Sequence, residues 1–293
     1  MGVIERDPYT GHGTTGHEWN GIKELNTRVP WVVWACLIGA VAFSVLWWIL
    51  LPAWPLGTTY TKGLLGWDAR TQVKADLRDA AEQRAVWMDR IANTDYAAIQ
   101  ADPALMRDVR ETGHTLFGDN CAACHGVGGK GGPGFPDLAE RAWLWGGTPD
   151  ALFQTIRVGV NTQHPDSRTS EMPAWGAQGM LPREAVVDVA NYVYSLTHTD
   201  GEASKAQLAS GAKVFAENCT ACHGANAKGN PELGAPDLTD KHYLYGSGLQ
   251  AIFETVYNGR KGIMPTWENR ITDLDRKILT LYVLDLRQAK AGQ

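Results

Sequence analysis

The sequence contains few cysteines and no strong excess of charge of either sign. Only five cysteines occur in 293 residues, and 27 basic side chains stand against 32 acidic ones, for a formal net charge of −5. This balance, without a basic stripe, argues against binding to nucleic acid. Four of the five cysteines lie in two short motifs, so no disulfide framework is expected.

Long hydrophobic runs are absent apart from one near the N-terminus. Residues 31–51, WVVWACLIGAVAFSVLWWILL, carry no charge. A helix of that length spans about 31 Å, which matches the core of a bilayer. The run is longer than the hydrophobic region of a signal peptide, and no small-residue cleavage site follows it. We therefore predict a retained transmembrane helix over 31–52, in which Cys36 is a small packing residue.

The motif Cys-x-x-Cys-His occurs twice, as CAACH at 121–125 and CTACH at 219–223. A zinc knuckle would need a second Cys/His pair close by, and a thioredoxin-like centre would need a βαβ pattern; the sequence has neither. The motif is the attachment signature of haem c, in which two thiols form thioethers and the histidine reaches the iron. Two covalently bound haem c groups are therefore predicted, one on Cys121, Cys124 and His125 and one on Cys219, Cys222 and His223.

The second ligand of each iron must come from another part of the chain. Met172 and Met264 both lie in a repeated Met-Pro-x-Trp segment. Recurrence at a matched position favours axial ligation over core packing. His164, in the longer loop of the first repeat, is an alternative ligand for the first haem. A haem with His and Met ligands has no open position, so it transfers electrons and binds no substrate.

The chain after residue 107 is an internal duplication, in which Pro136-Asp137-Leu138 recurs as Pro236-Asp237-Leu238. Each copy predicts a helix leading into the haem motif, a central helix and a terminal helix. The central helices are predicted at 148–159 and 248–258, and the terminal helices at 182–197 and 273–289. A helical stalk is predicted over 69–100, ending at a break near Pro103.

Each repeat resembles the class I cytochrome c fold. The resemblance implies that Gly113 or Gly211 lets the first helix cross closely over the last helix of its own repeat. The expected ring contacts are Phe117 with Tyr192 and Phe215 with Tyr282. Further haem-pocket residues implied are Pro133 and Pro231, as acceptors of the histidine N–H, and Arg157, Trp143, Trp145, Tyr243 and Tyr245, as propionate partners. Arg157 could equally be an ordinary surface residue.

The segment before the apolar run, HEWNGIKELNTRVPWVVW at 17–34, resembles the start of the dihaem subunit (CcoP/FixP type) of cbb3-type cytochrome c oxidases. That family has Asp-Gly-Ile, Glu-Leu-Asn and a proline before a tryptophan-rich helix. Here these are Asn20-Gly21-Ile22, Glu24-Leu25-Asn26 and Pro30-Trp31. The departures are Asn20 and residues 27–29. The order of the parts extends the resemblance over essentially the whole chain.

The resemblance implies an all-α fold, with one N-terminal transmembrane helix followed by two tandem class I cytochrome c domains. It implies a single-pass protein of the bacterial inner membrane with its haem domains in the periplasm. The expected segments are a cytoplasmic segment 1–30, the membrane helix 31–52, a periplasmic linker or stalk 53–107, domain one at 108–197 and domain two at 204–290.

The function implied is electron entry in aerobic or microaerobic respiration. A donor cytochrome c would deliver electrons to the two haems, which would pass them to the monohaem cytochrome c subunit and then to the haem-copper catalytic subunit. The apolar run has no histidine cluster for that oxygen chemistry, so no catalytic residue is predicted. Alternatives are a free-standing membrane dihaem shuttle, a cytochrome subunit of a periplasmic dehydrogenase, and a haem-based gas sensor or peroxidase.

Overall fold

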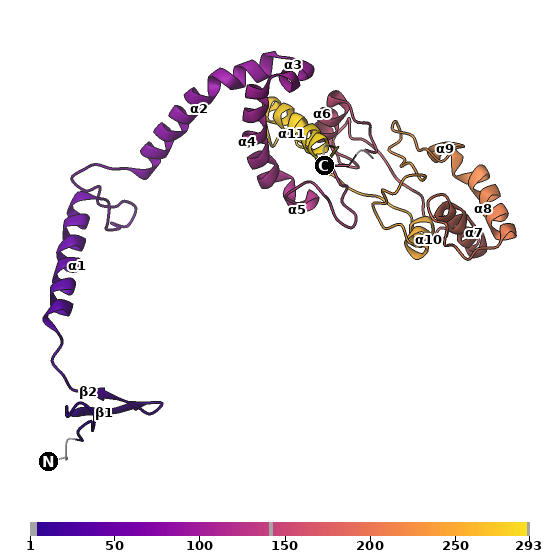
Figure 1. Cartoon of the computed structure of the whole chain (residues 1–293). Helices are drawn as coiled ribbons and strands as arrows, with labels where there is room; N and C mark the ends of the chain where they lie inside the picture. The colour runs from indigo at the N-terminus through magenta and orange to yellow at the C-terminus, as the bar shows by residue number, and fades with distance from the viewer. Residues whose placement is uncertain (1–4, 141–142, 292–293) are drawn as a thin grey trace. The chain divides into compact units, whose positions relative to one another are not determined.

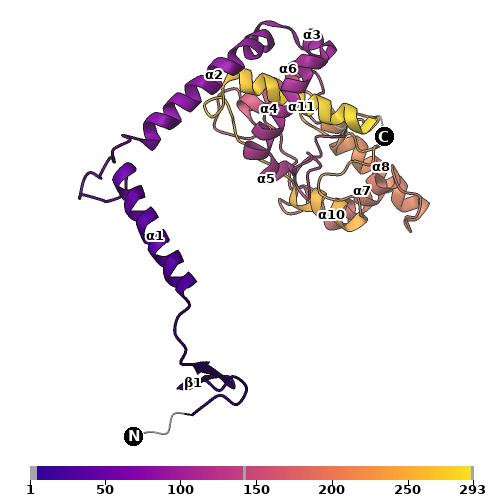
Figure 2. The same ribbon diagram turned by 60° about the vertical axis from the view of Figure 1, so that its left-hand side comes forward.

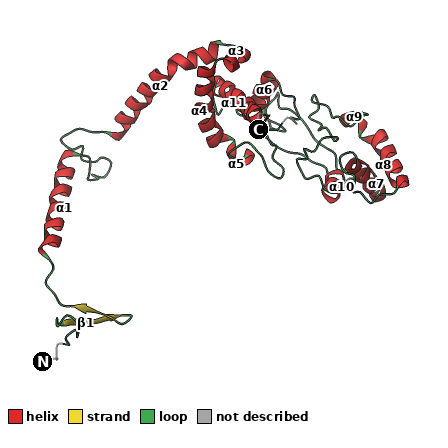
Figure 3. Ribbon diagram, in the orientation of Figure 1, coloured by secondary structure: helices red, strands yellow, loops and turns green. Residues whose placement is uncertain are grey.

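The computed structural model describes residues 5–140 and 143–291, so the first four residues of the predicted segment 1–30 lie outside the described residues. The chain divides into two compact units, Met1–Gln83 and Arg84–Gln293, which are described separately. Helices make up most of the regular structure (Figure 3). This agrees with the all-α class predicted from the sequence.

The first unit begins with a β-hairpin that the sequence analysis did not predict. Strands β1 (Thr14–Trp19) and β2 (Ile22–Leu25) are antiparallel, and Trp19 pairs with Ile22. Asn20 and Gly21 between them both have positive φ, 50° and 85°. An Asn-Gly pair favours this two-residue turn because both residues tolerate the left-handed region. The signal was therefore present in the sequence.

Helix α1 (Trp31–Leu50) coincides with the predicted membrane span. It is the one helix of the described residues that is long and apolar enough to cross a bilayer. Its large apolar side chains are exposed, from Trp31 at one end to Ile49 at the other. A soluble helix would bury such side chains, so α1 requires an apolar surrounding. The helix therefore fits a membrane anchor.

The predicted helix over 69–100 is two helices. Helix α2 (Ala69–Asn93) ends before Asp95, which caps α3 (Tyr96–Ala101) by accepting a hydrogen bond from Ala98 N. Pro103 is not only a helix breaker, because it is the first residue of α4 (Pro103–Asn120). Proline suits that position, where no intrahelical N–H bond is lost, and Asp102 caps the same end.

The remaining helices follow the pattern predicted for the duplication. The two central helices lie within one residue of the predicted bounds at each end, and the terminal helices within two residues. The elements are α5 (Ala122–His125), α6 (Pro149–Val158), α7 (Arg183–Ser195), α8 (Lys205–Asn218), α9 (Thr220–His223), α10 (Leu249–Asn258) and α11 (Asp273–Ala291).

The two repeats exchange their terminal helices. Helix α11, from the second repeat, packs against α4 and α6 of the first. Helix α7, from the first repeat, packs against α8 and α10 of the second (Figures 1 and 2). We refer to α4, α5, α6 and α11 as the first bundle, and to α8, α9, α10 and α7 as the second bundle. Each bundle therefore contains helices from both repeats.

The expected ring contacts within each repeat were wrong. The Phe117 ring lies 5.6 Å from the Tyr282 ring, and Tyr192 lies 5.4 Å from Phe215, between centroids. The two terminal helices carry similar packing patterns, so sequence alone did not choose between them. Only residues 196–204 join α7 to α8, and neighbouring helices pack with little loop-closure entropy. The short connection favours the exchanged pairing.

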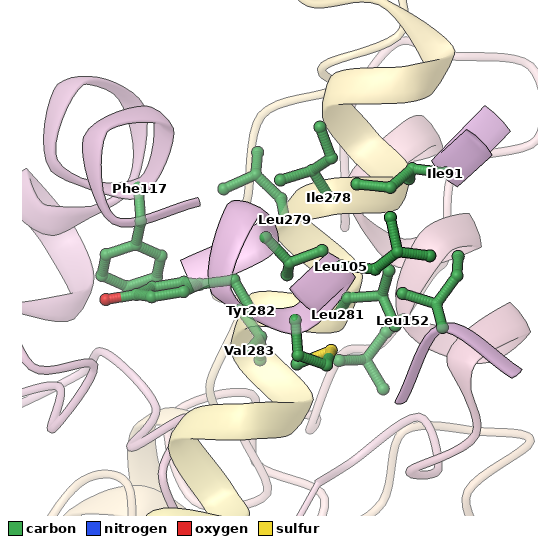
Figure 4. Close-up of a cluster of buried hydrophobic side chains, with 12 residues drawn as sticks. Ile91, Leu105, Phe117, Leu152, Ile278, Leu279, Leu281, Tyr282 and Val283 are labelled. Atoms are coloured by element: carbon green, nitrogen blue, oxygen red, sulfur yellow. The ribbon is translucent and has the colours of Figure 1, made fainter. Parts of the chain in front are cut away.

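The core of the first bundle shows the exchange in detail. Ile278, Leu281 and Tyr282 of α11 are buried together with Phe117 of α4 and Leu152 of α6 (Figure 4). Arg110 of α4 adds a bidentate ion pair with Asp285 of α11, at 2.8 and 2.9 Å. Burial of such apolar side chains is the main source of stability in a bundle. The first bundle therefore depends on the C-terminal helix of the chain.

Candidate haem-binding sites

Each haem motif forms one helical turn at the end of a longer helix. In the first bundle, Cys121 N–H donates to Phe117 O at 2.8 Å, and His125 N–H donates to Cys121 O at 2.9 Å. Residues three and four apart share a helix face, so Cys124 and His125 lie on the side of Cys121. Cys219, Cys222 and His223 repeat this arrangement on α9. The spacing thus presents two thiols and an imidazole to one surface.

Both histidines are oriented by a backbone carbonyl. His125 Nδ1 donates to Pro136 O at 3.1 Å, and His223 Nδ1 donates to Pro236 O at 3.1 Å. This bond leaves Nε2 of each ring as the free nitrogen, the form that a metal ligand requires. Burial lowers the pKa of both imidazoles, against a smaller opposing effect of the carbonyl bond. Each ring is therefore neutral at physiological pH.

The predicted acceptors Pro133 and Pro231 were wrong. In the first loop, Gly132 and Phe135 pair across a tight turn, which places the exposed Pro133 at its tip. Gly131, at φ +66°, turns the chain so closely that an added Cβ would overlap the Phe135 carbonyl. The chain returns at Pro136, whose carbonyl reaches the histidine. The repeated Pro-Asp-Leu tripeptide was the signal that could have identified this acceptor.

The thiols of Cys121 and Cys219 lie in surroundings that disfavour the thiolate form. Burial, and secondarily the neighbouring cysteine, raises the pKa of Cys121 to about 11. The same causes raise the pKa of Cys219 to about 11. A zinc site or a dithiol redox centre uses the thiolate form, which these environments disfavour. The raised pKa values therefore argue against a dithiol redox centre, which uses a thiol of lowered pKa.

The methionine loops are exchanged in the same way as the helices. Met172 of the first repeat pairs with Arg260 just after α10, through two backbone hydrogen bonds of 2.9 Å. Its side chain packs in the core cluster that contains Phe215 and Cys219. Met172 therefore belongs to the second bundle, with His223.

Met264 of the second repeat takes the corresponding place in the first bundle. It exchanges two backbone hydrogen bonds with Val160, just after α6, at 2.9 and 3.1 Å. Gly159 lies so close to the Met264 carbonyl that a Cβ there would overlap it, and Gly259 contacts the Met172 carbonyl equally closely. These glycines allow the methionine loops to lie against the ends of the central helices. Met264 thus lies in the bundle of His125.

His164 is not free to act as an axial ligand in this arrangement. Its Nε2 donates to Glu268 Oε2 at 2.7 Å, and its Nδ1 accepts from Asp166 N at 3.0 Å. Arg157 lies beside the same groups, with its guanidinium 3.3 Å from Asp166 and 3.7 Å from Glu268. These two carboxylates already offset the charge of Arg157. Its role as a propionate partner stays a prediction.

The aromatic residues predicted for the haem pocket lie under arginines. Arg168 lies over the Trp145 ring at 4.9 Å, and Arg260 over Tyr245 at 4.3 Å. The sequence analysis missed these two arginines. The available signal was an arginine four residues before each repeated methionine. Tyr243 differs, because its hydroxyl donates to the Leu238 carbonyl at 3.0 Å.

Several buried donors near these rings lack an acceptor. Among the described residues, Trp143 Nε1 and Arg168 Nε are buried without a hydrogen-bond partner, whereas Arg157 Nε, which also lacks a hydrogen bond, lies 3.7 Å from Glu268 Oε1. Buried donors are normally satisfied, so unpaired ones indicate a missing acceptor. Haem carries two propionates, whose oxygens are acceptors of the required kind. The residues present therefore fit a haem, whose propionates these donors would hold.

Comparisons with known proteins agree with two domains of the cytochrome c type. Residues 11–58 match the N-terminal domain of cytochrome oxidase-cbb3, FixP; residues 110–197 match cytochrome c; residues 206–283 match cytochrome c oxidase, cbb3-type, subunit III. The cbb3-type cytochrome c oxidase subunit FixP of Bradyrhizobium sp. (strain ORS 278) is 45% identical over 288 residues, which is 98% of each chain. Subunit CcoP of Azospirillum brasilense is 40% identical over 298 residues, 99% of this chain and 100% of the relative.

These similarities extend over the apolar helix, both haem motifs and both methionine loops. Such identity over nearly the full length of both chains goes beyond a shared cytochrome fold. The protein therefore belongs to the family of cbb3-type cytochrome c oxidase subunits FixP and CcoP.

Proposed function

We propose that this chain is a membrane-anchored dihaem relay of a cbb3-type oxidase. It takes electrons from a donor cytochrome c and passes them to the monohaem cytochrome c subunit and then to the haem-copper catalytic subunit. The observation that carries the proposal is the pair of equivalent sites, each with a Cys-x-x-Cys-His turn, a histidine held through Nδ1 and a methionine loop in the same bundle. The family membership supplies the partners.

The exchange of the methionine loops supports a crossed pairing of the axial ligands. We infer that His125 and Met264 are the axial ligands of the haem on Cys121 and Cys124, and that His223 and Met172 are those of the haem on Cys219 and Cys222. When bound, each haem supplies a one-electron iron couple, and a methionine ligand raises its potential. The chain's own residues hold the imidazoles neutral and aim Nε2 away from the carbonyls that orient them.

The repeats 108–197 and 204–290 are proposed to act as one electron-transfer body. Because each bundle contains the terminal helix of the other repeat, the bundles cannot separate without losing their cores. We place this body in the periplasm, since haem c is attached outside the cytoplasmic membrane in bacteria. Helix α1 then anchors it in the inner membrane, and residues 1–30 lie in the cytoplasm.

Purification of the tagged full chain from a detergent-solubilised membrane tests the proposal. We expect it to co-purify with oxygen-reducing subunits and to show two haem c groups per chain in a pyridine haemochrome assay. Recovery of the chain by itself, from cells that contain an active cbb3-type oxidase, would support the free-standing shuttle. Recovery with a dehydrogenase would support the other alternative. Fewer than two haems per chain would contradict the site assignment.

A further inference from the structure

The largest difference in length between the two repeats lies between the central helix and the methionine. From Gly159 to Met172 the first repeat has eight residues more than the second has from Gly259 to Met264. We call residues 161–168 the inserted loop. Because the methionine loops are exchanged, the inserted loop does not hold the methionine of its own repeat. It lies in the first bundle, where Asn161 N–H donates to Arg168 O at 2.7 Å and Arg168 N–H donates to Gly159 O at 3.2 Å.

The inserted loop contacts the second repeat through Asn161, whose Nδ2 donates to Gly262 O at 2.7 Å, and through His164. Its side chain is only 9% exposed, and its Nε2 lies 2.7 Å from Glu268 Oε2. Nδ1 accepts a hydrogen bond from Asp166 N at 3.0 Å, so the ring proton resides on Nε2 and is donated to the carboxylate. A hydrogen bond to a charged group is stronger than one between neutral groups, although the Glu268 side chain is 36% exposed. The contact joins segments 104 residues apart in sequence.

Glu268 lies four residues after Met264, on the same loop. This loop is fixed to the end of α6 at three further points: Thr266 Oγ1 donates to Arg157 O at 2.6 Å, and the backbone N–H groups of Trp267 and Glu268 each donate to that carbonyl at 3.2 Å. The Arg157 guanidinium also lies 3.7 Å from Glu268. The hydrogen bond from His164 is the largest cause that lowers the pKa of Glu268, so the carboxylate is charged at neutral pH.

The other methionine loop is tied by a contact of a different kind. Lys261 lies 2.8 Å from Glu171, next to Met172, but both side chains are more than half exposed, at 57% and 51%. Exposed ion pairs of this type contribute little to stability. The two methionines are therefore held unequally, by a contact between a 9% exposed histidine and a 36% exposed carboxylate at Met264 and by a more exposed pair at Met172.

We propose that His164 and Glu268 form a clamp that positions Met264 on the iron of the first bundle and suppresses its dissociation. The proposal rests on the proposed function, since it assumes that Met264 is an axial ligand. Both clamp members are positioning residues, which act through the loop and do not contact the iron. The clamp explains why the longer loop occurs in the first repeat, whose bundle receives the methionine of the second. It predicts that the two haems differ in how readily they lose methionine.

The test uses the purified full chain with both haems, and carbon monoxide as the probe. The measured quantities are the methionine-to-iron charge-transfer band of the oxidised protein and the fraction of reduced haem that binds carbon monoxide. Met264→Ala identifies the component that belongs to the first bundle. In His164→Ala we expect the carbon-monoxide-reactive fraction of that component to rise about tenfold, the scale of one lost hydrogen bond to a charged group. The component assigned to Met172 should be unchanged.

Two further variants separate positioning from folding. His164→Gln places an amide Nε2 near the position of the imidazole Nε2 and should restore most of the band. Glu268→Gln keeps an acceptor for His164 but removes the charge, so its reactive fraction should lie between those of the wild type and His164→Ala. Should His164→Ala fail to fold, an unchanged Glu268→Gln would refute the clamp. Lys261→Gln is the matched control at the other methionine loop and should resemble the wild type.

The outcomes distinguish the clamp from the function on which it rests. If Met264→Ala loses one component while His164→Ala behaves as the wild type, the clamp is refuted and the ligand assignment stands. If Met264→Ala keeps both components, the assignment of Met264 itself is wrong. An equal effect of His164→Ala on both components would show a general loosening of the fold and would also overturn the clamp.

Discussion

The ring of Phe117 packs against the ring of Tyr282, with 5.6 Å between their centroids, although the two residues belong to different repeats. Figure 4 shows this contact at the edge of the first core, beside Leu279 and Val283 of α11. The matching contact in the second bundle joins Tyr192 to Phe215. A tandem duplication has thus produced two bundles that are each built from both copies.

The crossing of α4 over α11 predicts a large effect at Gly113. A Cβ there would lie 2.6 Å from Tyr282 Cβ, so Gly113→Ala should force the helices apart and cost about 1–3 kcal/mol of unfolding free energy. Gly118→Ala, in the same helix, meets nothing within 4 Å. This control should be neutral or stabilising by up to about 1 kcal/mol. Denaturant unfolding of both variants measures the difference, and equal stabilities would contradict the close crossing.

The ligand pairs can be tested with one haem at a time. In a chain carrying Cys219→Ser and Cys222→Ser, only the haem on Cys121 should remain. There, Met264→Ala should abolish the methionine-to-iron band and lower the reduction potential, because a thioether ligand favours the reduced iron. Met172→Ala in the same background should leave the band in place. The reverse result would show that each repeat keeps its own methionine.

The turn that brings Pro136 to His125 depends on Gly131. Its φ of +66° and its contact with the Phe135 carbonyl leave no room for a Cβ. Gly131→Ala should therefore cost more than about 1 kcal/mol and reduce the amount of haem attached at the first motif. Gly132→Ala is the matched control, because a Cβ there meets nothing within 4 Å. Haem content per chain measures the effect, and equal haem loss in the two variants would argue against it.

The start of α4 should respond to acid. Hydrogen bonds from the N–H groups of Leu105 and then Ala104 hold the pKa of Asp102 below its ordinary value of 3.8. A carboxylate with a lowered folded-state pKa stabilises the fold above its unfolded pKa, and this contribution is lost as the pH falls through the folded value. Asp102→Ala should thus lower the unfolding temperature at pH 7. The difference from the wild type should shrink below about pH 4. A difference that does not vary with pH would show that the charge at this cap has no role.

The local elements were largely predictable from the sequence. An uncharged run such as 31–51 is compatible with few structures besides a membrane helix, and α1 begins and ends within a residue or two of the prediction. The central helices were equally clear, because Thr148-Pro149 begins α6 and Gly159 ends it. Where short-range signals were overlooked, as with the Asn20-Gly21 turn, the information was still local.

The errors arose where the answer depended on how the chain folds back on itself. Pro133 and Pro136 are close in sequence, and only the fold of the glycine loop decides which carbonyl reaches His125. The propionate role of Arg157 stays a prediction, and its position between Asp166 and Glu268 could not be deduced from its neighbours in the chain.

The sequence by itself determined the chemistry: the two haem motifs, the two methionines and the apolar helix follow from residue types at fixed spacings. Only the tertiary structure decided which methionine lies in the bundle of which histidine, and which terminal helix completes which bundle. The physical reason is that duplicated segments offer nearly the same apolar surface to either partner, so the local patterns are degenerate. The short connection between α7 and α8 and the close contacts at Gly113 and Gly211 exist only in the folded chain, and they remove that degeneracy.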